Sequence, residues 1–152
     1  MRLDFFEALH KEMSINEDIY FLTADLGYGL ADKIFEDFPE RALNTRAAEQ
    51  IMLGTAIGLT LQGKIAICYS ITPFLLLRPA EWIKLYLEHE KTPVKLVASG
   101  RKDDYLHDGI SHYGLENPFS ILNKFPEHFN NMEDCLKEVL YNDKPTFLSL
   151  KR

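Results

Sequence analysis

Short apolar runs alternate along the chain with stretches in which apolar residues recur every three or four positions. The runs are typical of buried strands, and we expect strands over residues 19–24, 42–45, 64–69, 93–98, 119–122 and 146–150. Helical spacing is found near Phe6, over residues 30–38, after Glu49, after Phe74 and after Asn131. Almost wholly apolar strands separated by helices predict a parallel sheet that is covered on both faces.

This order of elements predicts one α/β domain over residues 1–152. It would have three layers, with a mostly parallel six-stranded sheet between helices on both faces. Ligands of such sheets bind beyond the carboxyl ends of the strands. The loops expected there are residues 25–29, 45–49, 70–78 and 99–116.

The helix expected after the third strand is long. Trp82, Leu85 and Tyr86 share one of its faces, and Ile83 and Leu87 widen the apolar surface. Spacing of three and four residues is typical of one helix face, so we expect a broad apolar surface on this helix.

Composition and charge exclude several classes of protein. A chain of 152 residues with 46% hydrophobic and 26% charged residues can bury a real core. Seventeen basic and 23 acidic residues give a formal net charge of −6, without any basic run. Nucleic acid and anionic membranes need a concentrated basic face, so neither is expected as the main partner.

The remaining composition indicates a cytoplasmic protein. The N-terminus has acids inside its apolar stretch, unlike a signal peptide, and the most apolar run, residues 65–77, falls short of a membrane span. Cys68 and Cys135 lie far apart and are expected to be free thiols. The acids and histidines of residues 103–112 do not have the spacing of a standard ligand set, so no metal site is predicted in this chain.

The most informative stretch is the small-residue helix that begins near Glu49. A carboxylate in a first helical turn is stabilised by the helix dipole, which alone could explain Glu49. Gly54 and Gly58, however, lie four residues apart on the same helix, and each interior glycine costs about 1 kcal/mol relative to alanine. This helix therefore has a thin face, that is, a face of glycine and other small residues, which allows another backbone to come close.

Residues 48–63 read Ala-Glu-Gln-x-Met-x-Gly-x-Ala-x-Gly-Leu-x-Leu-x-Gly. This pattern is similar to the signature of the pyrimidine-binding domain of transketolases and of the related 1-deoxyxylulose-5-phosphate synthases. Residues 108–112, Asp-Gly-Ile-Ser-His, resemble the family's Asp-Gly-x-Thr-His. The resemblance extends over nearly all of the chain and implies the thiamine diphosphate-binding fold.

The resemblance also implies roles in holding the cofactor. Glu49 would hydrogen-bond the aminopyrimidine ring of thiamine diphosphate and activate the cofactor, and Phe74 would stack on the same ring. Arg78 resembles a cofactor-binding arginine of the synthases, although it stands one position out of step. The alternative for Phe74 is a core residue without a role in binding. The alternative for Arg78 is a surface or interface residue.

Further roles follow for the substrate and for the partner domain. Asp108 and His112 would face the substrate, and the imidazole could hydrogen-bond its carbonyl and hydroxyl groups and move protons. Arg101 stands where the synthases place an arginine for the substrate phosphate; a solvated charge cluster with Lys102 is the alternative. Asp25 would face the partner domain, unless it merely ends a strand.

Nothing in the sequence resembles the Gly-Asp-Gly…Asn signature that holds magnesium and the diphosphate in this superfamily. The resemblance therefore implies that a separate diphosphate-binding subunit shares the cofactor and holds Mg²⁺. Gly54 and Gly58 would then lie at a homodimer contact within a heterotetramer. Arg46 and Ala47 stand where the family usually has a glycine and a bulky aliphatic residue, so the pocket is expected to differ there from that of the family.

The predicted function is that of the pyrimidine-binding subunit of a split, transketolase-like enzyme. It would transfer a two-carbon ketol unit between sugar or sugar-phosphate substrates. One alternative is a thiamine diphosphate-dependent decarboxylase or another acyl-anion enzyme on the same two-chain plan. A second is a catalytically idle module for assembly or regulation, which Arg46 and Ala47 favour.

Overall fold

The computed structural model describes residues 1–114 and 116–152. The strands are β1 (Ile19–Thr23), β2 (Ala42–Asn44), β3 (Ile65–Ile71), β4 (Lys95–Ser99), β5 (Leu122–Lys124) and β6 (Thr146–Leu150). The helices are α1 (Arg2–Ile15), α2 (Asp32–Asp37), α3 (Glu49–Leu61), α4 (Thr72–Leu77), α5 (Ala80–Trp82), the π-helix η1 (Ile83–His89), the 3-10 helices η2 (Lys102–Asp108), η3 (Ile110–His112) and η4 (Pro126–His128), and α6 (Met132–Leu140).

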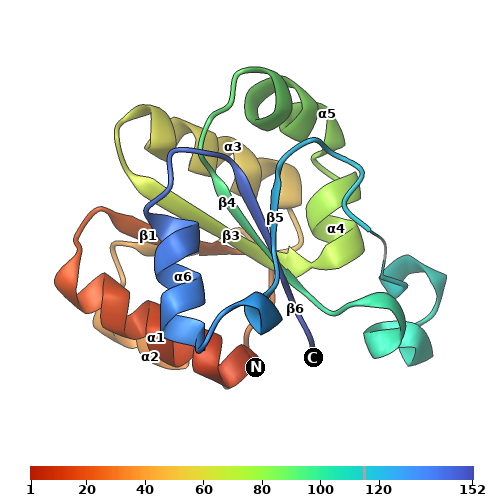
Figure 1. Ribbon diagram of the computed structural model, residues 1–152, viewed down its shortest axis with the longest axis horizontal. Coiled ribbons are helices and arrows are strands. Elements are labelled where there is room, and N and C mark those ends of the chain that lie inside the picture. Colours follow the sequence, from red (N-terminus) through yellow and green to blue (C-terminus); the bar gives the residue numbers. More distant parts are fainter. Residues whose placement is uncertain (115) are drawn as a thin grey trace.

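The six strands form one sheet in the order β2-β1-β3-β4-β6-β5, and every described pairing is parallel. The predicted α/β fold is therefore confirmed (Figure 1). The fifth strand lies later than the predicted residues 119–122. The backbone N–H groups of Phe119 and Ser120 donate to the side chains of Asn117 and Glu88 instead of to a neighbouring strand.

Helices cover both faces of the sheet, as predicted (Figure 1). Successive residues of a strand point to opposite faces, and β3 shows the consequence. Ile67 and Tyr69 lie in the core beneath α1, α2 and α6, whereas Ala66 and Cys68 lie in the core beneath α3, α4 and η1. Every residue of β4 and β6 is buried on one side or the other, which explains the mostly apolar sequences of these strands.

The helix predicted to follow residues 74–79 is present as α5 and η1, which run without a gap over residues 80–89, and the residues before it form the separate short helix α4. Pro79 has no N–H to donate, so it separates α4 from α5. The apolar face of the helix differs from the predicted one. Ile83 and Leu87 are fully buried, whereas Leu85 and Tyr86 are 49% and 39% exposed.

Trp82 packs directly on the thin face of α3. A Cβ atom added to Gly54 would lie 2.1 Å from Cζ3 of Trp82, so this glycine allows close packing within the chain itself. An added Cβ at Gly58 would meet nothing within 4 Å. The contact with Trp82 accounts for Gly54, and a partner contact at Gly58 stays a prediction.

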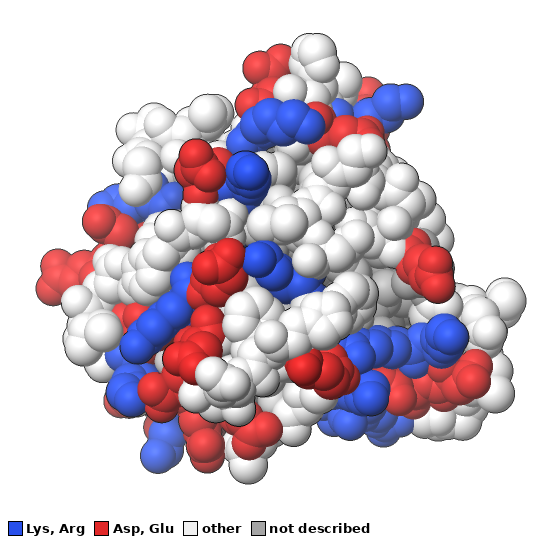
Figure 2. Space-filling view, viewed as in Figure 1, with Lys and Arg blue, Asp and Glu red and all other residues white. Residues whose placement is uncertain are grey.

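Positive and negative side chains are interspersed over the face shown in Figure 2. Of the described helices, none combines the length and hydrophobicity that a membrane crossing requires.

Candidate functional site

Glu49 lies at the carboxyl edge of the sheet, where parallel α/β folds bind their ligands. It is the first residue of α3, directly after the loop that leaves β2, and only 1% of it is exposed. Ser70, near the end of β3, is also buried. The fold therefore brings a buried acid of α3 next to a hydroxyl of β3.

Both carboxylate oxygens of Glu49 accept hydrogen bonds. Ser70 Oγ donates to Oε1 at 3.0 Å, and a guanidinium nitrogen of Arg78 donates to Oε2 at 2.6 Å. The arginine side chain is 42% exposed, so it lies on the solvent side of the buried acid. A charge-assisted hydrogen bond of this length is stronger than one between neutral groups.

Phe74 contacts the same guanidinium. The central carbon of that group lies 3.8 Å from the centroid of the Phe74 ring, a cation–π contact with Arg78. His112 also packs on this ring, with ring centroids 4.8 Å apart and an angle of 71° between the planes. The predicted residues Glu49, Phe74, Arg78 and His112 are thus brought together in one contiguous group.

A buried tyrosine anchors the loop that carries His112. Tyr105 is 7% exposed, and its hydroxyl is hydrogen-bonded to Ser99 Oγ at 2.8 Å. Its ring lies against Gly100, where an added Cβ would come within 2.3 Å and where φ is +86°. Glycine adopts this conformation readily, so Gly100 lets the loop turn over the tyrosine ring.

Asp108 lies at the end of η2, apart from the Glu49 group. Its carboxylate is 41% exposed and lies 3.3 Å from the imidazole of His107. Among the described residues, no hydrogen bond joins it to His112. A substrate role for Asp108 stays a prediction.

The Arg101 side chain is held in place by hydrogen bonds to Glu127 and Ser149. Two of its nitrogens donate to the carboxylate of Glu127 at 2.7 and 3.1 Å, and Nε donates to Ser149 Oγ at 3.1 Å. The ion pair lowers the pKa of Glu127 to about 2. The predicted contact with a substrate phosphate would require Arg101 to exchange these partners, and it stays a prediction.

Asp25 lies in the turn after β1, where φ is +56°. A hydrogen bond from the Tyr28 hydroxyl at 2.7 Å is the main cause that lowers the pKa of Asp25. Asn44, at the end of β2, accepts from the backbone N–H groups of Asp25 and Arg46 and so joins the two loops. Because Asp25 is exposed, it is available to a partner, but that contact stays a prediction.

Sequence reasoning missed Ser70, Asn44 and Tyr105. Ser70 and Asn44 carry a weak signal, since each is a polar residue at the carboxyl end of a predicted strand. Tyr105 carries none, because an aromatic residue among charged neighbours is typical of an exposed loop.

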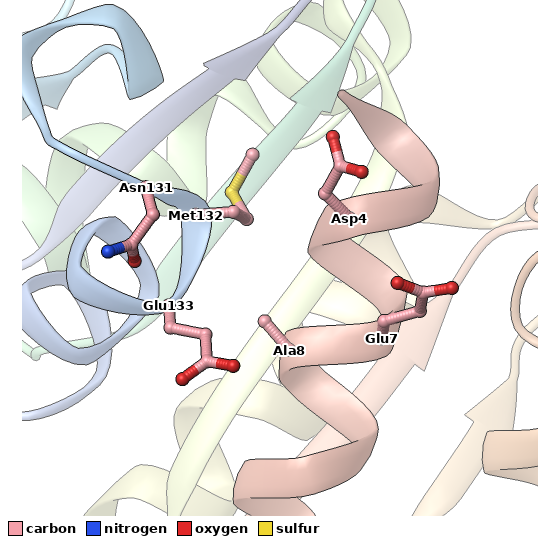
Figure 3. A pocket seen from close by; sticks show the side chains of 6 residues that line it. All are labelled: Asp4, Glu7, Ala8, Asn131, Met132 and Glu133. Carbon is pink, nitrogen blue, oxygen red and sulfur yellow. The ribbon is translucent and has the colours of Figure 1, made fainter.

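Open cavities lie elsewhere on the molecule. A groove of about 610 Å³ lies between α1 and α6. The side chains that line it are Asp4, Glu7, Ala8, Asn131, Met132 and Glu133 (Figure 3). A second cavity, of about 370 Å³, lies near the ends of β4 and β6 and includes Arg101 and Phe125 in its lining. Within the described part of the chain, no three His, Cys, Asp or Glu side chains are grouped as a metal-binding set.

The chemistry of the Glu49 group fits a flat nitrogen heterocycle. A buried carboxylate can hydrogen-bond a ring nitrogen or an amino group, and the face of Phe74 can stack on the ring. Both groups already hold a planar cation, the Arg78 guanidinium. Fold and site together define an α/β domain with a buried carboxylate and an aromatic ring side by side at the carboxyl edge of its sheet.

Comparison with known proteins identifies the family. The chain is 34% identical over 127 residues to a Methanocaldococcus jannaschii protein provisionally named transketolase C-terminal section, covering 83% of this chain and 40% of that protein. It is 33% identical over 121 residues to one of the subunits of the apulose-4-phosphate transketolase of Actinobacillus succinogenes, covering 76% and 39% of the two chains. No profile of a known protein family matches the chain.

The fold matches a solved structure described as a split-gene transketolase in the form of an inactive tetramer. The TM-score is 0.80 at 25% identity, and the match covers 98% of this chain and 50% of that one. The chain belongs to the transketolase family and has the fold of its pyrimidine-binding domain. It spans about 40% of the length of the two curated relatives.

Proposed function

We propose that this chain is the pyrimidine-binding subunit of a thiamine diphosphate-dependent, transketolase-like enzyme. The observation that carries the proposal is the buried carboxylate of Glu49 beside the ring of Phe74, at the carboxyl edge of a transketolase-type sheet. When bound, the cofactor supplies a carbon nucleophile for the transfer of a two-carbon ketol unit between sugar-type substrates.

The residues of this chain would have separate roles around that cofactor. Glu49 would hold and share a proton with the nitrogen of the aminopyrimidine ring, with Ser70 fixing the orientation of its carboxylate. Phe74 would support the ring from one face. His112, which packs edge-on against Phe74, would hydrogen-bond the substrate beside the ring.

A second polypeptide would complete the site by binding the diphosphate and Mg²⁺. The names of the relatives support this arrangement, since one is a single subunit of a transketolase and another is a split-gene transketolase. Asp25 and the open face at Gly58 are the surfaces that we assign to subunit contacts.

The proposal is tested by reconstitution. Wild type and Glu49→Gln are each mixed with the diphosphate-binding subunit, Mg²⁺ and thiamine diphosphate, and two-carbon transfer between ketose and aldose substrates is measured. The amide keeps the shape of Glu49 but cannot share its proton, so we expect turnover to fall at least about 100-fold.

Gln50→Ala is the matched control, since Gln50 neighbours Glu49 but is exposed. Equal turnover by wild type and Glu49→Gln would overturn the role of the acid. Release of carbon dioxide in place of ketol transfer would assign the chain to the decarboxylase alternative.

A further inference from the structure

Arg78 makes, within this chain, the two contacts that the proposed function assigns to the aminopyrimidine ring. One is a hydrogen bond to Glu49 Oε2 at 2.6 Å, and the other is stacking on the Phe74 ring at 3.8 Å. A guanidinium is planar and presents N–H donors in its plane. An aminopyrimidine protonated on its ring nitrogen shares both properties.

The two groups cannot occupy one place together. Glu49 is 1% exposed and the Arg78 side chain is 42% exposed, so the guanidinium covers the acid from the solvent side. A ring that approaches Glu49 and Phe74 from solvent meets Arg78 first. Binding of the ring therefore requires the arginine side chain to move away.

The contacts of Arg78 are compatible with such a movement. Its guanidinium makes one described hydrogen bond, to Glu49, and leaves its other N–H groups without a described protein acceptor. Its backbone lies at the break between α4 and α5, directly before Pro79. A long, partly exposed side chain at a helix break can change rotamer without disturbing the core.

We infer that Arg78 is a displaceable cover of the pyrimidine site, whose guanidinium takes the place of the cofactor ring until the ring replaces it. This inference rests on the proposed function and adds a form of regulation to the same site. The cover keeps a buried carboxylate paired while the ring is absent, and it makes binding of the ring a competition with Arg78.

The test uses the chain in complex with the diphosphate-binding subunit and the ring half of the cofactor, 4-amino-5-hydroxymethyl-2-methylpyrimidine. Binding to wild type, Arg78→Met and Arg78→Gln is followed by NMR titration. Loss of a competing ion pair and cation–π contact should lower the dissociation constant about tenfold in both variants. Arg78→Gln keeps a hydrogen-bond donor for Glu49. Its dissociation constant replaces that of Arg78→Met in the comparison if Arg78→Met is too unstable.

Two further measurements complete the design. Lys11→Gln is the charge control, since Lys11 is 60% exposed and pairs with Glu133, not with Glu49; its affinity should equal that of wild type. The Nε–H signal of Arg78 in wild type should shift as the ring is added.

The outcomes separate the two hypotheses. Tighter binding by both Arg78 variants, lost again when Glu49→Gln is added, supports the cover. Weaker or equal binding by the variants overturns the cover and leaves the ring site in place. Failure of every variant and of wild type to bind the ring overturns the proposed site, and the cover with it.

Discussion

Glu49 shows how a buried charge is stabilised before any ligand arrives. Its carboxylate accepts from Ser70 on one oxygen and from Arg78 on the other. A buried ion without such partners would be strongly destabilising. Ser70 of β3 and Arg78, directly after α4, thus compensate the buried charge of Glu49. On the proposed function, the cofactor ring would replace Arg78 as one of these two partners.

A second buried charge lies at the amino end of β4. Lys95 is 1% exposed, and its Nζ donates to the backbone oxygens of Asn142 and Lys144, each at 2.8 Å. Burial lowers the pKa of this lysine from 10.5 to about 8. The lysine joins β4 to the loop before β6, far along the sheet from Glu49.

The shifted pKa of Lys95 predicts how stability depends on pH. Between about pH 8 and pH 10.5 the unfolded chain binds the proton more tightly than the folded chain, so the free energy of unfolding should rise with pH across this range. Below pH 8 both states are protonated, so Lys95 adds no slope there. Urea denaturation of wild type and Lys95→Met measures the effect.

The variant should be less stable throughout, because the backbone carbonyl groups of Asn142 and Lys144 lose their donor. The difference between the two stability curves must nevertheless widen from pH 8 to pH 10.5. Parallel curves would contradict the lowered pKa.

At the scale of the element, α3 carries two glycines in different surroundings. Gly54 lies against Trp82, whereas Gly58 faces open space. Gly54→Ala should destabilise the fold by about 1–3 kcal/mol, because the indole ring must move. Gly58→Ala should stabilise it by up to about 1 kcal/mol through helix propensity. Chemical denaturation compares the two variants.

Trp82 is the one tryptophan of the chain, so its fluorescence reports on the same contact. The emission maximum should shift in Gly54→Ala and remain that of wild type in Gly58→Ala. Identical spectra and equal stabilities for the two variants would contradict the packing of Trp82 on α3.

At the scale of the whole molecule, the predictable features were those set by local pattern. Apolar runs predicted the strands because a sheet covered on both faces buries every residue of its central strands. The family motifs around Glu49, Phe74 and His112 predicted a shared site, and the structure places Glu49 and Phe74 on either side of Arg78, with His112 against Phe74.

Contacts between side chains and backbone groups of different elements could not be predicted. The pair between Glu49 and Arg78 joins two residues that are 29 positions apart, and helical periodicity gives no information on which side chains of different elements meet. The fifth strand begins later than its apolar run because side chains of Asn117 and Glu88 hold the backbone before it.

The central claim is that Glu49 and Phe74 hold the ring of thiamine diphosphate. Calorimetric titration of thiamine diphosphate with Mg²⁺ into the complex with the diphosphate-binding subunit tests it directly. We predict a saturable heat for wild type and an affinity at least about tenfold weaker for Glu49→Gln and for Phe74→Leu. Equal affinities for the three complexes, or no heat with any of them, would contradict the claim and favour an idle assembly module.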